Sequence, residues 1–321
     1  MAVLALTQPA ARAADALIGH WLSGPASLTD SSTFSPAGTH DGVAVGDNAA
    51  LLAWSADVPP GGFTGQSLDL SATSVAVLIT NTATSDANYQ NTFDEGIATR
   101  FTAAFWFKGP LAGTWVGKSG NSGMGWKTRP LSPKADFTMR NNGLGETVPS
   151  AMQSANDVND GNWHHMAAVF DGRASFREVY VDGVLQARTT GTPYRVNFNN
   201  LSHLMVGATQ NNGANDIFTT WPFFSGLMYD VRMYGYPLSA AEVDSVYSRR
   251  PILTGITGAG TAGFTIQGST AYAGNLVTLK ATNLSPPNWT PIQTNAVPIG
   301  TFSITIPLGL DPHAFYRLMV P

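Results

Sequence analysis

The chain carries the stretch DGNWHHMAAVFDG at residues 160–172 and the stretch EVYVDGVLQA at residues 178–187. The apolar residues between the two Asp-Gly pairs of the first stretch predict a strand over 163–170. The second stretch holds Asp182-Gly183 between two β-rich runs. An Asp-Gly pair in that setting indicates a hairpin, because a type I′ turn needs a positive φ at both central residues. The two stretches therefore predict neighbouring antiparallel strands.

Strand-like segments recur on both sides of this passage. A single helix is predicted over 239–247, where Ser239 and Glu242 have the spacing of a capping box. The pair Arg249-Arg250 before Pro251 indicates a domain boundary. The further predicted strands are 67–70, 75–79, 101–107, 204–208 and 226–234 before the boundary and 264–266, 276–281, 302–306 and 314–320 after it. We therefore expect an all-β chain with a β-sandwich over 15–250 and a small C-terminal β domain over 252–321.

Composition narrows the class of protein. Only 12% of the 321 residues are charged, the net charge is −4, and the 17 basic residues are scattered, which argues against a nucleic-acid binder. The chain has no cysteine, so neither disulfides nor Cys-based zinc sites are possible. No apolar run approaches the roughly 18 residues that span a bilayer.

The first residues are typical of a processed leader. Residues 1–13 look like the remnant of a signal peptide, because Ala11-Arg12-Ala13 fits an A-x-A cleavage site. The alternative is an ordinary flexible N-terminus. The first interpretation predicts a secreted, extracellular protein.

The central motifs resemble those of a known family. Residues 160–172 are similar to the "DGxWHHVAxxxDG" stretch of bacterial laminin-G-like domains, and 179–183 resemble the "LYVDG" hairpin of that family. Residues 226–243 resemble its "GxIDDVRIYxxxLSxxEV" segment, although Tyr229 stands where the first of two aspartates is expected. The resemblance implies a two-sheet antiparallel jelly-roll sandwich of the concanavalin A-like type, used to bind glycans or proteins.

The resemblance also implies that the first and last strands of the sandwich lie together. That pairing would bring Asp30 close to Asp230, and carboxylates from distant segments suit a structural calcium ion, Ca²⁺. In the alternative, Asp30 forms an Asx-turn and Asp230 pairs with Arg232 or Arg177. The pair His164-His165 is a weaker metal candidate, because adjacent strand residues point to opposite faces.

Aromatic residues in segments rich in Gly, Asn or Pro are candidates for contact with sugars. Exposed rings stack on the apolar faces of sugars, and nearby amides and carboxylates bind hydroxyl groups. The alternative is that these rings cover the ends of the sandwich. The predicted ligand-binding residues are Trp115, Trp126, Tyr194, Asn211, Asn212, Asp216 and Trp221.

Catalysis is less favoured by the sequence. Glycoside hydrolases on related sandwiches use paired carboxylates, but no glutamate here has an acidic residue at i+2. The four glutamates are Glu95, Glu146, Glu178 and Glu242. We expect a secreted module that binds a polysaccharide or glycoprotein. The alternatives are a structural or adhesive surface protein that assembles through its C-terminal unit, where the run 315–320 is suited to strand addition, and a polysaccharide-degrading hydrolase or lyase.

Overall fold

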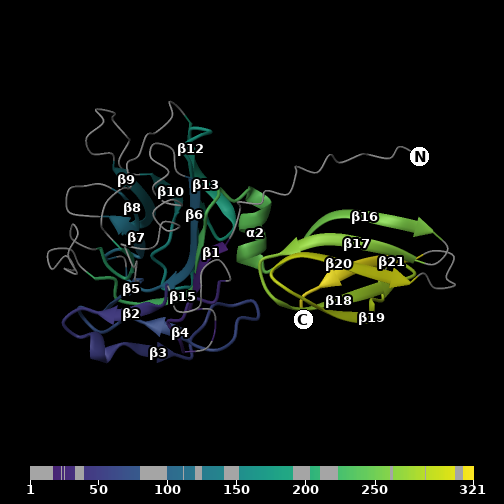
Figure 1. Ribbon diagram of the computed structural model, residues 1–321, viewed down its shortest axis with the longest axis horizontal. Coiled ribbons are helices and arrows are strands. Elements are labelled where there is room, and N and C mark those ends of the chain that lie inside the picture. The colour runs from purple at the N-terminus through teal and green to yellow at the C-terminus, as the bar shows by residue number, and fades with distance from the viewer. Residues whose placement is uncertain are drawn as a thin grey trace. The chain divides into compact units, whose positions relative to one another are not determined.

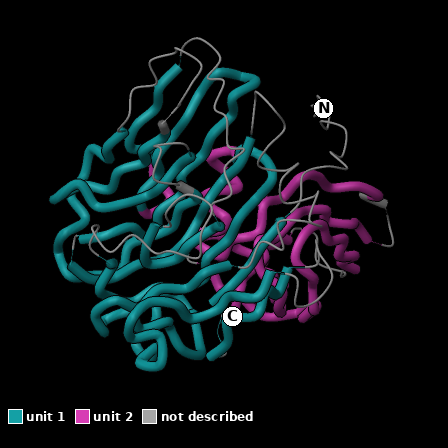
Figure 2. The backbone as a smooth tube through the Cα atoms, turned by 60° about the vertical axis from the view of Figure 1, so that its left-hand side comes forward, with its two compact units in different colours: residues 1–181, 185–238 teal, residues 182–184, 239–321 magenta. Residues whose placement is uncertain are grey.

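The computed structural model describes most of the chain (Figure 1) and divides it into two compact units (Figure 2). One unit comprises residues 1–181 and 185–238, and the other comprises 182–184 and 239–321. The predicted signal-peptide remnant, residues 1–13, lies outside the described part. The described residues are 17–22, 24, 26–32, 40–79, 100–110, 112–119, 125–140, 152–190, 203–209, 223–260, 263–285, 287–307 and 314–321.

The first unit is a sandwich of two antiparallel sheets, which confirms the predicted fold class. The eight-stranded sheet runs β13 (Val184–Thr190), β12 (Phe176–Val181), β11 (His164–Asp171), β6 (Arg100–Lys108), β15 (Leu227–Tyr234), β4 (Ser67–Asp69), β3 (Ala53–Ser55), with β1 (Leu17–Trp21) also paired to β15. The seven-stranded sheet runs β10 (Gln153–Asp157), β9 (Lys134–Arg140), β8 (Gly125–Leu131), β7 (Val116–Ser119), β14 (Leu204–Val206), β5 (Ala76–Ile79), β2 (Gly42–Val45). A short 3-10 helix, Ala49–Leu51, follows β2.

The hairpin at one edge of the larger sheet forms as the sequence predicts. Strand β11 pairs on one side with β6 and on the other with β12. The chain turns from β12 into β13 at Asp182 and Gly183, whose φ angles of 50° and 77° are both positive, as a type I′ turn requires.

Aromatic side chains fill the space between the two sheets. The ring of Trp115 stacks on Phe107 with centroids 4.1 Å apart, and Trp126 lies 4.7 Å from Phe101. All four rings are buried. Each contributes about 1.5–3 kcal/mol through burial of apolar surface, so this cluster is a main source of the sandwich's stability.

The second unit combines a helix with two three-stranded sheets. Helix α2 (Ala240–Ser248) has the predicted capping box between Ser239 and Glu242 and ends at Arg249, whose φ is 59°. The sequence placed this helix in the sandwich domain, whereas the division into compact units groups it with the C-terminal strands. One sheet has the strand order β16 (Ile252–Gly260), β17 (Gly263–Thr270), β20 (Gly300–Pro307). The other has the order β19 (Thr290–Val297), β18 (Gly274–Ala281), β21 (Phe315–Met319).

Contacts within the second unit connect its helix to its strands. The hydroxyl of Tyr272, from the turn between β17 and β18, donates to the backbone oxygen of Val246 in α2 at 2.7 Å. The guanidinium of Arg249 lies 5.1 Å from the centroid of the Tyr272 ring. Within the described part of the chain, α2 is too short and too polar to cross a membrane.

The capping box gives a first prediction. Replacing Ser239 with Ala removes the acceptor for the Glu242 amide and is expected to lower the free energy of unfolding by about 1 kcal/mol, measured by urea denaturation. Ser248→Ala is the control at the other end of the helix, where the Ser248 hydroxyl donates to the Asp244 carbonyl and accepts a long bond from the Arg250 amide at 3.3 Å. Such back-bonding to the carbonyl four residues earlier stabilises a helix little. Equal losses in both variants would contradict this account of the helix start.

Candidate functional site

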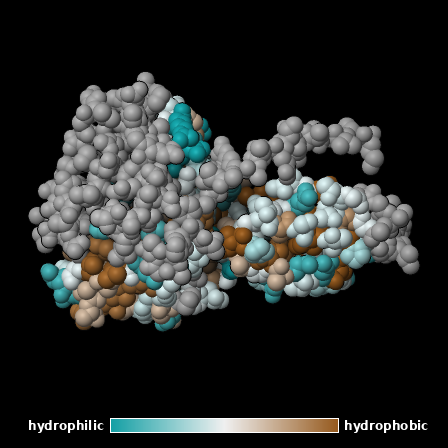
Figure 3. All heavy atoms as spheres, viewed as in Figure 1, coloured by the Kyte–Doolittle hydropathy of each residue, from teal (hydrophilic) through white to brown (hydrophobic). Residues whose placement is uncertain are grey.

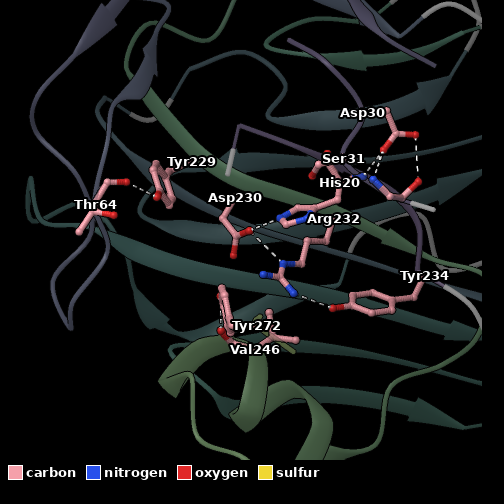
Figure 4. Close-up of polar contacts among 11 residues, drawn as sticks. His20, Asp30, Ser31, Thr64, Tyr229, Asp230, Arg232, Tyr234, Val246 and Tyr272 are labelled. Carbon is pink, nitrogen blue, oxygen red and sulfur yellow. Dashed lines mark hydrogen bonds and ion pairs between the residues drawn. The ribbon is translucent and has the colours of Figure 1, made fainter. Parts of the chain in front are cut away.

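The pairing of β1 with β15 creates a buried polar network (Figure 4). His20 lies opposite Arg232 in the register, and a bulge before Arg232 places Asp230 at a φ of 52°. Arg232 Nε donates to Asp230 Oδ1 at 2.9 Å, and His20 Nε2 lies 2.6 Å from the same oxygen. Arg232 Nη1 also donates to the Tyr234 hydroxyl at 3.3 Å. The first strand is thus held to the last by a buried ion pair and an imidazole.

Asp30 fixes the loop that follows β1. Its Oδ1 accepts from the backbone amides of His20 and Ser32, both at 2.9 Å, and its Oδ2 accepts from the Ser32 hydroxyl at 3.0 Å. The bond to Ser32 N is an Asx-turn. Ser31 adds two bonds to the His20 carbonyl. Asp30 therefore contacts the backbone of His20 and Asp230 contacts its ring, although the two aspartates are far apart in the sequence.

These two carboxylates do not fit a shared calcium ion. Asp230 shares one oxygen between a guanidinium and an imidazole, and both Asp230 and Arg232 are buried. A divalent cation there would face the buried positive charge of Arg232, whose Nε already donates to Asp230. The arrangement matches the alternative drawn from the sequence, an Asx-turn at Asp30 and an Asp230–Arg232 pair. Across the described residues, no cluster of three or more His, Cys, Asp or Glu is suited to a metal ion.

The predicted sugar-contacting rings divide into two groups. Trp115 is 0% exposed and Trp126 is 1% exposed, so the expectation that they stand exposed is wrong. The glycine-rich surroundings suggested loops, but strand pairing across β7 and β8 turns both indoles into the core. Five further predicted residues lie outside the described part of the chain: Tyr194, Asn211, Asn212, Asp216 and Trp221.

The two adjacent histidines point to opposite faces of β11, as predicted. The His165 ring lies 5.3 Å from the Trp106 ring, on the face of the sheet away from the core. The His164 ring lies 5.9 Å from the core residue Phe107, and its Nε2 is 3.0 Å from Asp160. A shared metal ion is thereby excluded for this pair.

A different group of side chains lies at the start of β11, and we call it the Trp163 cluster: Asp57, Lys108 and Trp163. In the β11–β6 register His164 faces Phe107, so Trp163 and Lys108 are the next neighbours. They point away from the core, because strand side chains alternate between faces. Asp57 reaches them from the loop between β3 and β4.

Asp57 holds both partners of the cluster through its carboxylate. Trp163 Nε1 donates to Oδ1 at 2.8 Å, and Lys108 Nζ donates to Oδ2 at 2.7 Å. The Lys108 and Asp57 side chains are 32% and 43% exposed, and Trp163 is partly exposed. Partial burial acts to raise the pKa of Asp57, but the bonds from Lys108 and Trp163 outweigh it and lower that pKa below its ordinary value.

The turn before Trp163 is ordered by Asp160. Its carboxylate accepts from the backbone amide of Asn162 at 2.8 Å and from the Asn162 side chain at 2.9 Å. These bonds, with a smaller contribution from His164, lower the pKa of Asp160 to about 2. An exposed carboxylate and amide therefore lie in the residues leading directly into the indole.

The sequence predicted that Trp163 begins a strand over 163–170. The structure instead begins β11 at His164, which leaves the indole at the rim of the sheet. The signal that marked this position was the turn sequence Asp160-Gly161-Asn162 immediately before it. Nothing in the sequence indicated Asp57, which lies 106 positions away.

Fold and site together define a β-sandwich module of the concanavalin type. The chain belongs to the laminin-G family described as the concanavalin A-like lectin/glucanases superfamily, whose family model matches residues 81–244. No curated protein matches the chain.

Solved structures with a similar fold include three that illustrate its range. Domain 4 of AbnA, a GH43 extracellular arabinanase from Geobacillus stearothermophilus, in complex with arabinotriose, is 16% identical with a TM-score of 0.49, covering 73% of this chain and 98% of that one. The Ruminococcus gnavus IT-sialidase CBM40 bound to α2,3-sialyllactose is 13% identical with a TM-score of 0.44, and the match covers 56% of this chain and 96% of that one. The botulinum neurotoxin serotype C1 binding domain is 12% identical with a TM-score of 0.48, and the match covers 82% of this chain and 57% of that one. These similarities concern the fold alone.

The buried network predicts how stability depends on pH. Burial, followed by the charge of Arg232, lowers the pKa of His20 below its ordinary 6.5, against the opposing effect of Asp230. The native state therefore binds a proton less readily than the unfolded state. The contribution of His20 is complete above pH 6.5 and is lost as the pH falls below that value.

The measurement is the free energy of urea unfolding between pH 7.5 and about pH 5. The wild type is expected to lose stability more steeply than His20→Gln, which lacks the titrating group but is less stable at pH 7.5. Identical slopes in the two proteins would show that His20 does not carry this dependence.

Proposed function

We propose that this protein is a secreted, non-catalytic carbohydrate-binding module that binds a polysaccharide or the glycan of a glycoprotein at the Trp163 cluster. The observation that carries the proposal is a partly exposed indole, held in place by a carboxylate that is itself paired with Lys108. Membership of a superfamily described by lectins and glucanases supports a carbohydrate ligand.

The cluster has the chemistry that sugars require. An indole face accepts the C–H face of a pyranose or furanose ring. The carboxylate of Asp57 retains lone pairs beyond the two bonds it accepts, and the ammonium of Lys108 retains further protons to donate. Both groups can therefore bind sugar hydroxyls beside the ring. Because Trp163 is already fixed by its bond to Asp57, little conformational freedom is lost on binding.

The described glutamates support binding over hydrolysis. Glu178 is buried and accepts from the Tyr180 hydroxyl at 2.9 Å and from Arg188 Nη1 at 2.6 Å. Glu242 closes the capping box of α2. Each has a structural task, whereas a hydrolase needs two carboxyl groups about 5–9.5 Å apart across the scissile bond. Glu95 and Glu146 lie outside the described residues.

A second candidate function is a structural or adhesive surface protein that assembles through its C-terminal unit. Strand β16 is at the edge of its sheet, and its side chains Leu253 and Ile256 are 56% and 65% exposed. The run predicted for strand addition forms β21, which is also at a sheet edge. Unprotected apolar edges favour pairing with another chain.

The proposed site is tested by Trp163→Ala. We expect the wild type to be retained in affinity electrophoresis by at least one soluble polysaccharide of a plant and microbial panel. The variant is expected to bind about tenfold more weakly, because it loses the stacking surface. Trp163→Phe keeps a ring and should fall between the two.

Leu131→Ala is the control, since Leu131 is an exposed apolar residue on the other sheet. Melting curves establish that each variant is folded. Undiminished retention of folded Trp163→Ala would remove the cluster as the binding site. Absence of retention in the wild type, together with concentration-dependent assembly in sedimentation, would favour the second candidate.

A further inference from the structure

The sheet β19–β18–β21 of the C-terminal unit has one face that the core of the unit does not use. Tyr316, Leu318 and Val320 pack against the core cluster of this unit. The alternating residues Phe315, Arg317 and Met319 therefore point to the opposite face. In the register they lie beside residues of β18, with the pairs Phe315–Ala281, Arg317–Leu279 and Met319–Val277.

This outer face is apolar and in part exposed to solvent. Phe315 is 40% exposed and Met319 is 38% exposed, whereas their neighbours Leu279 and Ala281 on the same face are buried. Figure 3 shows brown apolar residues among pale and teal ones on the visible side of this unit. Exposed apolar side chains with polar neighbours are candidates for a binding surface.

Arg317 is the one charged residue on the outer face of these three described strands. The other charge in them is Lys280, which pairs in register with the inward-facing Tyr316 and so points to the other face. Residues 252–321 contain three charged residues in all, Lys280, Asp311 and Arg317. No hydrogen bond or ion pair to a carboxylate neutralises Arg317 among the described residues.

The guanidinium of Arg317 is held in place by an aromatic ring. Its Cζ lies 4.9 Å from the centroid of the Trp289 indole, which is partly exposed. Stacking restrains the orientation of the guanidinium plane and leaves its N–H groups free to form a bidentate pair with a carboxylate. As far as the described residues go, the face therefore offers one oriented cation without a carboxylate partner, flanked on β21 by Phe315 and Met319.

We propose that this outer face, around Trp289 and Arg317, is a second carbohydrate-binding site that is selective for a uronic-acid polysaccharide. Arg317 pairs with the uronate carboxylate, and Phe315 and Met319 accept the C–H face of a neighbouring sugar ring. Charge complementarity favours this occupant: among the residues that the structure describes, the face carries the Arg317 cation and no carboxylate, and a uronate unit combines an apolar ring face with a single carboxylate. The inference rests on the proposed function for the class of ligand.

The matched ligands are polygalacturonate and its fully methyl-esterified form, which share one backbone and differ in the carboxylate charge. The full chain is titrated with each by isothermal calorimetry. We expect the wild type to bind the acid form about tenfold more tightly than the ester. Arg317→Gln should abolish that preference, chiefly by weakening binding of the acid form, and Arg317→Lys should retain part of it. Trp289→Ala should weaken binding of both forms.

Arg173→Gln is the control for net charge, since Arg173 is exposed in the turn between β11 and β12 and its loss removes the same charge. The inference is overturned if Arg317→Gln behaves like Arg173→Gln, or if the wild type binds both forms equally or neither. It is also overturned if dextran sulfate competes as well as polygalacturonate, or if Trp289→Ala instead dissolves a dimer in sedimentation.

Trp163→Ala separates this inference from the proposed function. It should weaken binding of both polymers alike and preserve the preference for the acid form. If Trp163→Ala binds as the wild type does and Arg317→Gln loses the preference for the acid form, the Trp163 cluster alone is refuted. If Trp163→Ala binds more weakly and Arg317→Gln keeps the preference, the Arg317 site alone is refuted.

Discussion

Burial of aromatic rings between the two sheets is the constraint on which the rest of this structure depends. Without cysteine, the sandwich is held by packing, and rings such as Phe101, Phe107, Trp115 and Trp126 supply its interior. A ring used in this way is unavailable to a ligand. Among the described tryptophans, Trp54, Trp163 and Trp289 are left partly exposed. Trp54 also packs against the core, which leaves Trp163 and Trp289 as the indoles best placed for recognition.

The buried network between β1 and β15 serves the fold in a different way. Removing Asp230 and Arg232 from water is costly, and their mutual bond together with His20 and Tyr234 offsets that cost. Loss of one partner of such a pair typically costs about 3–5 kcal/mol, because the other charge is left buried. The network therefore joins the first strand of the sandwich to its last strand through contacts among His20, Asp230, Arg232 and Tyr234.

Features set by local sequence were predictable, and features set by long-range contact were not. The hairpin at Asp182-Gly183 and the capping box of α2 follow from spacings of a few residues, so both were predicted. The meeting of the Asp30 loop with Asp230 followed from the family resemblance. The burial of Trp115 and Trp126 depends on strand pairing across β7 and β8, which their glycine-rich surroundings concealed. The bond between Asp57 and Trp163 joins two loops that no local pattern connects.

The most direct test of the account is the indole N–H resonance of Trp163 in a ¹⁵N-labelled protein titrated with an oligosaccharide of the retained polymer, assigned by its loss in Trp163→Phe. The account predicts that this resonance shifts saturably, because the ligand lies against a ring whose N–H is bonded to Asp57. The resonances of the buried Trp115 and Trp126 should stay in place. Saturable binding that moves other resonances and leaves that of Trp163 unchanged would contradict it.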